Sequence, residues 1–415
     1  MRDLPSSSGP VQVIAWIAEK DPVAREVVLR DPSGYARVRV AGDQGIFELP
    51  LETLAWIDGY ARGGELEVRR LAPITRPIEE RRVDYLDPPA TLEEYLANYA
   101  WYARGPRAMR AARAVHEIQQ AVRGSLVRRG FIELPPLITQ PASDPGLRGA
   151  RKVRAILYGF EVELASSMIM YKQLMASIHE KIFYMARNIR EEPLSNASTG
   201  RHLYEFTQVD VEWGLSDAET VMRLAEEVLS ETARALLERV ELGDASRRNL
   251  EALAKGGPYA RLTYDEALEF LKKRGFEVKW GEELPQHAEA ELSRAFDGPL
   301  WLVGFPAESR GFYYYPRDDD PRYNVDFNLL LPGGYGEVVD GGCREYRYER
   351  IVERLRRHGE PLEKYSWFLE AARAGGIAPS CGWGLGLERL ARYALAEEHV
   401  AYATPHPRVP GVLSP

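Results

Sequence analysis

Five short stretches between Val11 and Leu71 alternate hydrophobic and polar residues, which predicts five β-strands. They read VQVIAWI, REVVLRD, YARVRV, LAWIDGY and ELEVRR, and turn residues such as those from Asp31 to Gly34 separate them. An alternation with a period of two is typical of a strand with one buried face. Because several short strands in one compact segment favour closure into a barrel, we expect a small β-barrel domain over residues 1–72.

The rest of the chain mixes helical and strand patterns. Residues 73–105 are rich in proline and charge, as in a linker between domains. Apolar positions at helical spacing run from Pro106 to Gly130, and a second such run begins at Ser216, which forms a capping-box pattern with Glu219. Extended apolar stretches return after Pro299. We therefore predict an α+β protein whose second domain, residues 106–415, contains a small insertion at about 243–299.

The segment from Arg190 to Trp213 is predicted to form the end of one strand, a polar loop and a return strand. One face of the return strand carries Phe206, Gln208, Asp210 and Glu212, and the other carries Val209 and Val211. The solvated side of an antiparallel sheet would show the same alternation. Arg190, Arg201 and His202, however, bracket the loop with cationic donors that suit phosphate oxygens, and Phe206 offers a flat face for a base. The combination favours a nucleotide site.

Composition limits the classes of protein that fit. The chain has 415 residues, of which 45% are hydrophobic, enough for sizeable cores. No apolar run approaches the ~20 residues of a membrane span, and the N-terminus lacks the pattern of a signal peptide. We therefore expect a cytoplasmic protein without membrane contact. The formal net charge of -8 argues against a non-specific nucleic-acid binder and leaves room for a local basic patch.

Cys343 and Cys381 are the only cysteines in the chain. Neither belongs to a Cys-x-x-Cys motif, and the pair predicts neither a disulfide framework nor a zinc site. We expect a small buried thiol at each position.

Three motifs follow one another in the second domain. They are the Arg-x-Glu at Arg190 followed by RHLYEFTQVDVE, the glycine-rich GEVVDGGCRE from Gly336 to Glu345, and GWGLGLERL from Gly382 to Leu390. Together they resemble motif 2, the glycine-rich strand and motif 3 of class II aminoacyl-tRNA synthetases, in the aspartyl and asparaginyl subgroup. The resemblance implies a catalytic domain built on an antiparallel sheet flanked by helices. It also implies a homodimer, because the helix from Pro106 and the FIELPPL that follows resemble motif 1, the dimer interface of that family.

The resemblance also assigns an ATP site. Activation of a carboxylate by ATP needs in-line attack at the α-phosphorus and neutralised phosphates, so ATP and Mg²⁺ are the expected cofactors. By resemblance, Arg190 holds the α-phosphate, Phe206 stacks on adenine opposite Arg389, and Glu192 accepts from the adenine amino group. Arg201, His202 and Arg389 are the candidates for the other phosphate contacts, and Glu337 and Asp340 are those for magnesium.

Lys172, Arg344 and Asp210 point to aspartate as the amino acid. Two cations that face one side chain suit a carboxylate, and Asp210 suits an α-ammonium group. Asparagine would leave buried cations partly unpaired. Further candidates for amino-acid binding are Ser167, Gln208 and Asp144, the last in a polar loop from Ser143 to Lys152 where the family has a mobile loop.

Two departures from the family bear on the acceptor of the activated amino acid. The Ser-Ser-Met-Ile before Tyr171 and Lys172, and Gly200 directly before Arg201, are most similar to the archaeal asparagine synthetases related to asparaginyl-tRNA synthetase. In the barrel, which resembles an anticodon-binding OB-fold domain, Glu26 and Arg37 replace a stacking Phe and a Gln. A carboxylate cannot stack on a base, so we do not expect ordinary anticodon reading.

The sequence leaves two acceptors open. We expect aspartyl adenylate to be attacked by ammonia, which gives free asparagine without tRNA. The alternative is an aspartyl- or asparaginyl-tRNA synthetase that transfers the amino acid to tRNA, and the retained barrel favours it. A third hypothesis, a catalytically silent paralogue that only binds partners, conflicts with the presence of both motif arginines and both metal carboxylates.

Overall fold

The computed structural model of the protein describes residues 1–415 except residues 2, 43–44, 80, 145–148 and 414–415. Part of the predicted loop from Ser143 to Lys152 therefore lies outside the described residues. The chain divides into two compact units, Met1–Met109 and Arg110–Pro415. No described helix has the length and apolar character needed to cross a membrane.

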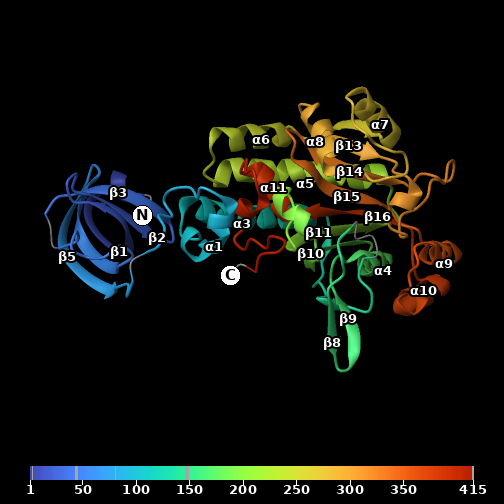
Figure 1. The fold of residues 1–415 in the computed structure, drawn as a ribbon, viewed down its shortest axis with the longest axis horizontal. Coiled ribbons are helices and arrows are strands. Elements are labelled where there is room, and N and C mark those ends of the chain that lie inside the picture. Colours follow the sequence, from blue (N-terminus) through green and yellow to red (C-terminus); the bar gives the residue numbers. More distant parts are fainter. Residues whose placement is uncertain (2, 43–44, 80, 145–148, 414–415) are drawn as a thin grey trace. The chain divides into compact units, whose positions relative to one another are not determined.

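The first unit contains the five predicted strands, closed into an OB-like barrel in the order β1-β2-β3-β5-β4 (Figure 1). The strands are β1 (Ser8–Asp21), β2 (Glu26–Asp31), β3 (Gly34–Val40), β4 (Leu54–Arg62) and β5 (Glu65–Thr75). Neighbours are antiparallel except β3 and β5, which pair in parallel. Alternate side chains such as Ile17, Leu29 and Ile57 are buried in the barrel, so the period-two pattern of the sequence corresponds to its interior.

The segment that follows the barrel packs on it. It contains two short helices, α1 (Leu92–Ala97) and α2 (Tyr99–Tyr102). The hydroxyl of Tyr85 donates to Glu52 Oε1 at 2.5 Å, and Arg81 Nη1 donates to the carbonyl of Ala18 at 2.6 Å. These contacts hold the described residues around Arg81 and Tyr85 against the barrel.

The second unit is built on an eight-stranded sheet in the order β12-β13-β14-β15-β16-β11-β10-β6. Its strands are β6 (Ile132–Glu133), β10 (Lys181–Ile189), β11 (Glu205–Gly214), β12 (Ala260–Thr263), β13 (Leu300–Val303), β14 (Asp326–Leu331), β15 (Gly336–Cys343) and β16 (Ser380–Gly386). The neighbouring pairs from β13–β14 through to β11–β10 are antiparallel. The two edge pairs, β12–β13 and β10–β6, are parallel. The predicted antiparallel sheet is confirmed.

Helices cover both faces of this sheet (Figure 1). One hydrophobic core joins residues of α3 (Pro106–Arg128), α5 (Ala218–Arg239), α6 (Asp244–Ala254) and α11 (Leu387–Ala394) to the inner strands. α4 (Ile169–His179) packs on β10, β11 and β16. The remaining helices are α7 (Tyr264–Lys273), α8 (Gln286–Arg294), α9 (Tyr348–Arg357) and α10 (Ser366–Arg373), and the short 3-10 helices are η1 (Leu4–Ser6), η2 (Leu194–Ser198), η3 (Ala307–Ser309), η4 (Leu362–Tyr365) and η5 (Val400–Ala403).

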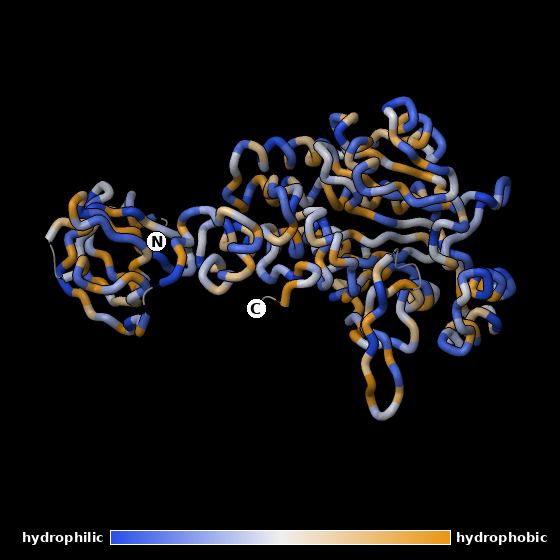
Figure 2. Tube along the Cα trace, in the orientation of Figure 1, coloured by the Kyte–Doolittle hydropathy of each residue, from blue (hydrophilic) through white to orange (hydrophobic). Residues whose placement is uncertain are grey.

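A three-stranded sheet carries a hairpin away from this body (Figure 1). Its order is β7-β9-β8, formed by β7 (Thr139–Gln140), β8 (Arg154–Leu157) and β9 (Phe160–Leu164). Hydrophobic residues line the hairpin in Figure 2, and Ile156 and Phe160 are 68% and 73% exposed.

Two local predictions are wrong. The N-cap of α5 is Asp217, whose side chain accepts from the backbone N–H of Thr220 at 2.7 Å, and not Ser216. Cys343 and Cys381 are not thiols but form a disulfide, because the two residues are direct partners in the β15–β16 ladder. Sequence spacing alone does not reveal such a strand register.

Candidate active site

The strand β11 supplies one wall of the candidate site. Val209 and Val211 point into the hydrophobic core and are fully buried. Phe206, Gln208 and Asp210 point the opposite way and line a cavity. The predicted division of this strand into a core face and a chemical face is confirmed.

Every residue that the sequence predicted for the site lines this one cavity. The residues are Asp144, Ser167, Lys172, Arg190, Glu192, Arg201, His202, Phe206, Gln208, Asp210, Glu337, Asp340, Arg344 and Arg389. They come from α4, β11, β15, α11 and the adjoining loops, including the loop that follows β10. The three motifs therefore face one common cavity.

Two glycines of β16 leave space for side chains of the neighbouring strand β11. A Cβ atom at Gly384 would lie 1.9 Å from Nε2 of Gln208, and one at Gly382 would lie 2.3 Å from Oε2 of Glu212. Neither separation is physically possible, so any larger residue would displace these side chains. Gly382 and Gly384 of the third motif are thus explained by close packing beneath the cavity.

Glu337 and Asp340 reach the cavity together because β15 contains a bulge. Residues three apart in a regular strand point to opposite faces. Leu329 of β14 pairs with Val339 and Leu330 pairs with Glu337, so Val338 is an extra residue. One extra residue reverses the alternation and brings both carboxylates to the same side.

These two carboxylates fit a magnesium ion that is completed by a nucleotide. Glu337 accepts from Arg389 Nη1 at 2.9 Å, and Asp340 accepts from Arg310 Nη2 at 3.2 Å and from the hydroxyl of Tyr314. Mg²⁺ usually takes one or two carboxylates and fills its shell with phosphate oxygens and water. The described residues contain no cluster of three or more His, Cys, Asp or Glu poised to bind a metal. The oxygen donors of the pair and their place in a cavity lined by arginines suit such a shared ion.

Three arginines, two of which pair with carboxylates, cluster at one end of the cavity. Burial, followed by the nearby Arg201, lowers the pKa of Arg389 to about 10, so Arg389 stays protonated at neutral pH. Arg201 Nη1 donates to Glu289 Oε2 at 2.6 Å, and both side chains are buried. The guanidinium of Arg190 lies 5.1 Å from the ring centre of Phe206. Such a cluster suits a polyanion such as a nucleotide triphosphate.

His202 differs from the sequence expectation of a cationic donor. Burial, and then the charges of Arg389 and Arg201, lower its pKa to about 2. The ring is therefore neutral at physiological pH, and its Nδ1 lies 2.6 Å from Oγ1 of Thr199. Any phosphate contact of His202 is a neutral hydrogen bond.

At the other end of the cavity each predicted cation has a buried carboxylate partner. Lys172 Nζ lies 3.1 Å from Asp210 Oδ1. Arg344 forms a bidentate ion pair with Glu212, with Nε 3.0 Å from Oε1 and Nη2 3.1 Å from Oε2. These four side chains carry no net charge together, so the structure does not support the expectation that this end demands an anion.

Two atoms at this end lack a hydrogen-bond partner among the described residues. They are Asp210 Oδ2 and Arg344 Nη1, and both are buried. An unpaired buried polar atom costs about 1–3 kcal/mol. Asp210 Oδ2 is an acceptor and Arg344 Nη1 is a donor. A ligand that offers both a donor and an acceptor would satisfy the two atoms.

Sequence reasoning missed the supporting residues. Alternation placed Glu212 on the chemical face, yet its bond to Arg344 joins positions 132 residues apart. Glu289 lies in the insertion, where no motif signals chemistry, and Tyr314 belongs to a stretch assigned only to strand structure. No local pattern could have identified these partners.

Comparisons with known proteins agree with the motifs. The family model "tRNA synthetases class II (D, K and N)" matches residues 92–410. Asparagine--tRNA ligase of Thermococcus gammatolerans is 29% identical over 98% of this chain and 96% of that protein. An enzyme of the same name from Thermus thermophilus is 30% identical over 92% of this chain and 91% of its own.

A solved structure extends the likeness to both units. The asparaginyl-tRNA synthetase of Pyrococcus horikoshii, complexed with asparaginyl-adenylate, is 27% identical and superposes with a TM-score of 0.86 over 100% of this chain and 98% of that one. The chain therefore belongs to the class II tRNA synthetases of the D, K and N group and is an AMP-forming ligase.

Proposed function

We propose that this protein is an asparagine–tRNA ligase, which activates asparagine with ATP and transfers the asparaginyl group to tRNA. The observation that carries the proposal is the pair Asp210 Oδ2 and Arg344 Nη1, which lack partners among the described residues. A carboxamide complements both atoms, because its NH₂ group donates and its oxygen accepts. The side chain of asparagine is a carboxamide.

Aspartate fits the same place less well. A carboxylate has no hydrogen to donate, and it would bring a second negative charge against Asp210. The earlier expectation of aspartate counted Lys172 and Arg344 without the carboxylates that neutralise them. A site that leaves a buried polar group unpaired discriminates by about 1–3 kcal/mol, which supports asparagine as the preferred substrate.

The α-ammonium group of the amino acid needs a separate negative partner. Asp144 is buried and lines the same cavity, and Ser167 and Gln208 add a hydroxyl and an amide. With the α-ammonium group held there and the carboxamide between Asp210 and Arg344, the α-carboxylate faces the cationic end.

The cationic end would perform activation. An oxygen of the α-carboxylate attacks the α-phosphorus of ATP in line, which forms the mixed anhydride, and pyrophosphate leaves. Arg190 would stabilise the α-phosphate as charge shifts to the leaving group, and Arg201 and Arg389 would hold the distal phosphates. Mg²⁺, held by Glu337 and Asp340, would neutralise phosphate charge. Phe206 and Glu192 would bind the adenine.

The second step needs a hydroxyl acceptor. The 3′-terminal ribose of tRNA attacks the adenylate carbonyl, and AMP leaves with the electron pair of the anhydride bond. The relatives named asparagine--tRNA ligase match nearly the whole chain, barrel included, which supports tRNA over ammonia. On the barrel, Arg37 pairs with Glu19 at 2.7 Å and with Glu26 at 3.5 Å, so RNA contacts there would be polar and not stacked.

The proposed active form is a homodimer. Apolar side chains are exposed along β6, the segment before β7, and the β8–β9 hairpin, namely Ile132, Leu137, Ile138, Ile156 and Phe160. Exposed apolar surface of this kind marks contact sites between proteins. Sedimentation equilibrium at micromolar concentration should give twice the chain mass, and an Ile156→Asp, Phe160→Asp double variant should shift to the monomer.

Isotope exchange between pyrophosphate and ATP tests the proposal. Exchange should depend on asparagine, with aspartate at least roughly tenfold poorer in kcat/KM, and acylation of tRNA should follow. Asparagine made from aspartate and ammonium without RNA would instead establish the ammonia-dependent reaction. A protein that exchanges only with aspartate would overturn the amide assignment of Asp210 and Arg344.

A further inference from the structure

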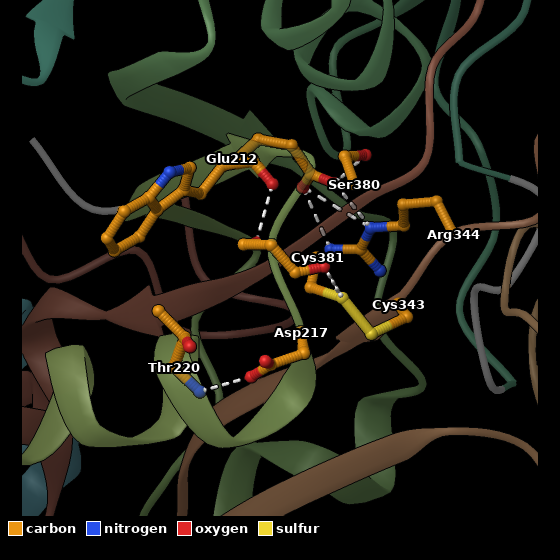
Figure 3. The surroundings of a disulfide bond; sticks show 9 residues. Glu212, Asp217, Thr220, Cys343, Arg344, Ser380 and Cys381 are labelled. Carbon is orange, nitrogen blue, oxygen red and sulfur yellow. Dashed lines mark hydrogen bonds and ion pairs between the residues drawn. A yellow bond between two sulfur atoms is a disulfide. The ribbon is translucent and has the colours of Figure 1, made fainter.

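The disulfide between Cys343 and Cys381 lies directly beside the residues that hold the amino-acid-reading arginine (Figure 3). Cys343 precedes Arg344 in the chain, and Cys381 follows Ser380. The backbone N–H of Arg344 donates to the carbonyl of Ser380 at 2.8 Å. The bond therefore fastens β15 to β16 at the point where Arg344 leaves the sheet.

Side-chain contacts also connect Arg344 to the neighbouring strands. Glu212 of β11 holds Arg344 by a bidentate ion pair, and Ser380 Oγ donates to Glu212 Oε1 at 2.7 Å. Arg344, Glu212 and Ser380 are all buried. The direction of the guanidinium thus depends on three strands, of which β15 and β16 are joined by the disulfide.

The disulfide lies at the end of the β15–β16 ladder, where strand pairing stops. β15 ends at Cys343, the next 36 residues form α9, η4, α10 and their connections, and β16 begins at Ser380. Main-chain hydrogen bonds at the end of a ladder open more readily than those in the middle. A covalent link on the last paired position prevents the two strands from separating there.

We propose that the Cys343–Cys381 disulfide is a positioning element of the amino-acid pocket, so that its reduction weakens recognition of the amino-acid side chain and leaves ATP binding largely unchanged. The proposal rests on the proposed function for the identity of the amino acid. Displacing a substrate-orienting group by about 1 Å can reduce a rate by ~10²-fold. ATP would be spared because its predicted ligands Arg190, Phe206 and Arg389 have no described contact with the cysteines.

Cys343 is the more accessible of the two cysteines. Cys343 is half-buried, whereas Cys381 is 2% exposed. A dithiol would attack Cys343 Sγ, break the S–S bond and release Cys381 as the leaving thiolate, which takes up a proton. The second thiol of the reductant then displaces Cys343. The reductant ends as a disulfide, and two electrons and two protons reside on the cysteines. Cys381 Sγ lies 3.2 Å from the carbonyl oxygen of Ser216, so the new thiol has an acceptor in place.

The test compares oxidised and reduced protein of unchanged sequence. Because the chain has only two cysteines, titration of thiols in denaturant should find none in the oxidised form and both after dithiothreitol. In isotope exchange, reduction should raise KM for asparagine roughly tenfold and lower the preference for asparagine over aspartate, with little change in KM for ATP. The preference for asparagine over aspartate is the decisive readout. General unfolding would lower the rates with both amino acids alike and leave their ratio unchanged.

A Cys343→Ala, Cys381→Ala double variant provides the matched control. It should resemble the reduced protein and be insensitive to dithiothreitol. Equal KM and equal selectivity in the oxidised and reduced forms, or two free thiols after mild oxidation, would overturn the proposal. Failure of the proposed function looks different, since asparagine would then support no exchange in either redox state, and the comparison would be repeated with aspartate.

Discussion

The guanidinium of Arg344 and the carboxylate of Glu212 form a fully buried bidentate ion pair in which two contacts measure 3.0 and 3.1 Å. Glu212 does not line the cavity, whereas Arg344 does. Glu212 therefore acts through Arg344, by holding its direction and neutralising its charge. Burial would lower the pKa of Arg344, but the nearby Glu212 outweighs it and raises that pKa.

Replacing Glu212 should change which amino acid the pocket prefers. In Glu212→Gln the side chain keeps its size but loses its charge, so the pocket gains one net positive charge. We expect kcat/KM for asparagine to fall roughly tenfold or more and the relative use of aspartate to rise. Isotope exchange with both amino acids measures this ratio. Glu205→Gln, on the same strand but paired with the exposed Arg187, is the control, and a ratio equal to that of the wild type would refute the role of Glu212.

Glu289 of α8 should control the phosphate end of the site. Its carboxylate holds Arg201 at 2.6 Å, and both side chains are buried. In Glu289→Gln we expect KM for ATP to rise roughly tenfold, because the guanidinium loses its orientation, with KM for asparagine nearly constant. Glu291→Gln on the same helix breaks only a longer pair with Arg274, at 3.4 Å, and should have no such effect. A parallel rise in both KM values would indicate general unfolding instead.

The neutral His202 predicts a specific loss of stability in acid. Its pKa is about 2 in the folded protein and 6.5 in the unfolded chain, so below pH 6.5 the unfolded state binds the extra proton. The stabilisation is present above pH 6.5 and is lost as the pH falls, by up to ~1.4 kcal/mol per pH unit. Urea unfolding between pH 7 and pH 5 should show a flatter dependence in His202→Asn than in the wild type. His406→Asn, an exposed position, is the control, and equal slopes would contradict the buried neutral ring.

Loss of the disulfide should lower global stability as well as affect the pocket. The bond joins residues 38 positions apart, and the chain-entropy estimate for a loop of that length is about 3–4 kcal/mol. Urea unfolding of the second unit should show this loss in Cys343→Ala, Cys381→Ala. Dithiothreitol should destabilise the wild type by a similar amount and leave the double variant unchanged. An identical midpoint in the oxidised and reduced wild type would show that the bond does not constrain the unfolded chain.

Local patterns in the sequence predicted much of the fold, and the resemblance of three motifs to a known family supplied most of the candidate site residues. Alternation in β11 separated the core residues Val209 and Val211 from Gln208 and Asp210, and the five strands of the barrel followed from the same period. The three motifs identified residues from separate parts of the chain that line one cavity. The separate chemical roles of these residues remain predictions that the variants above would test.

Only the tertiary structure decided which side chains these residues contact. The strand order that sets β11 beside β16 and β15 brings Glu212 to Arg344 and Cys343 to Cys381, and the bulge at Val338 turns Glu337 toward Asp340. The face of a strand that a residue occupies depends on its position along the sequence, so the hydrophobic period can predict it. Charge balance in a pocket depends on neighbours in space. For this reason the sequence predicted aspartate, whereas the paired cations of the folded pocket support the proposal of asparagine.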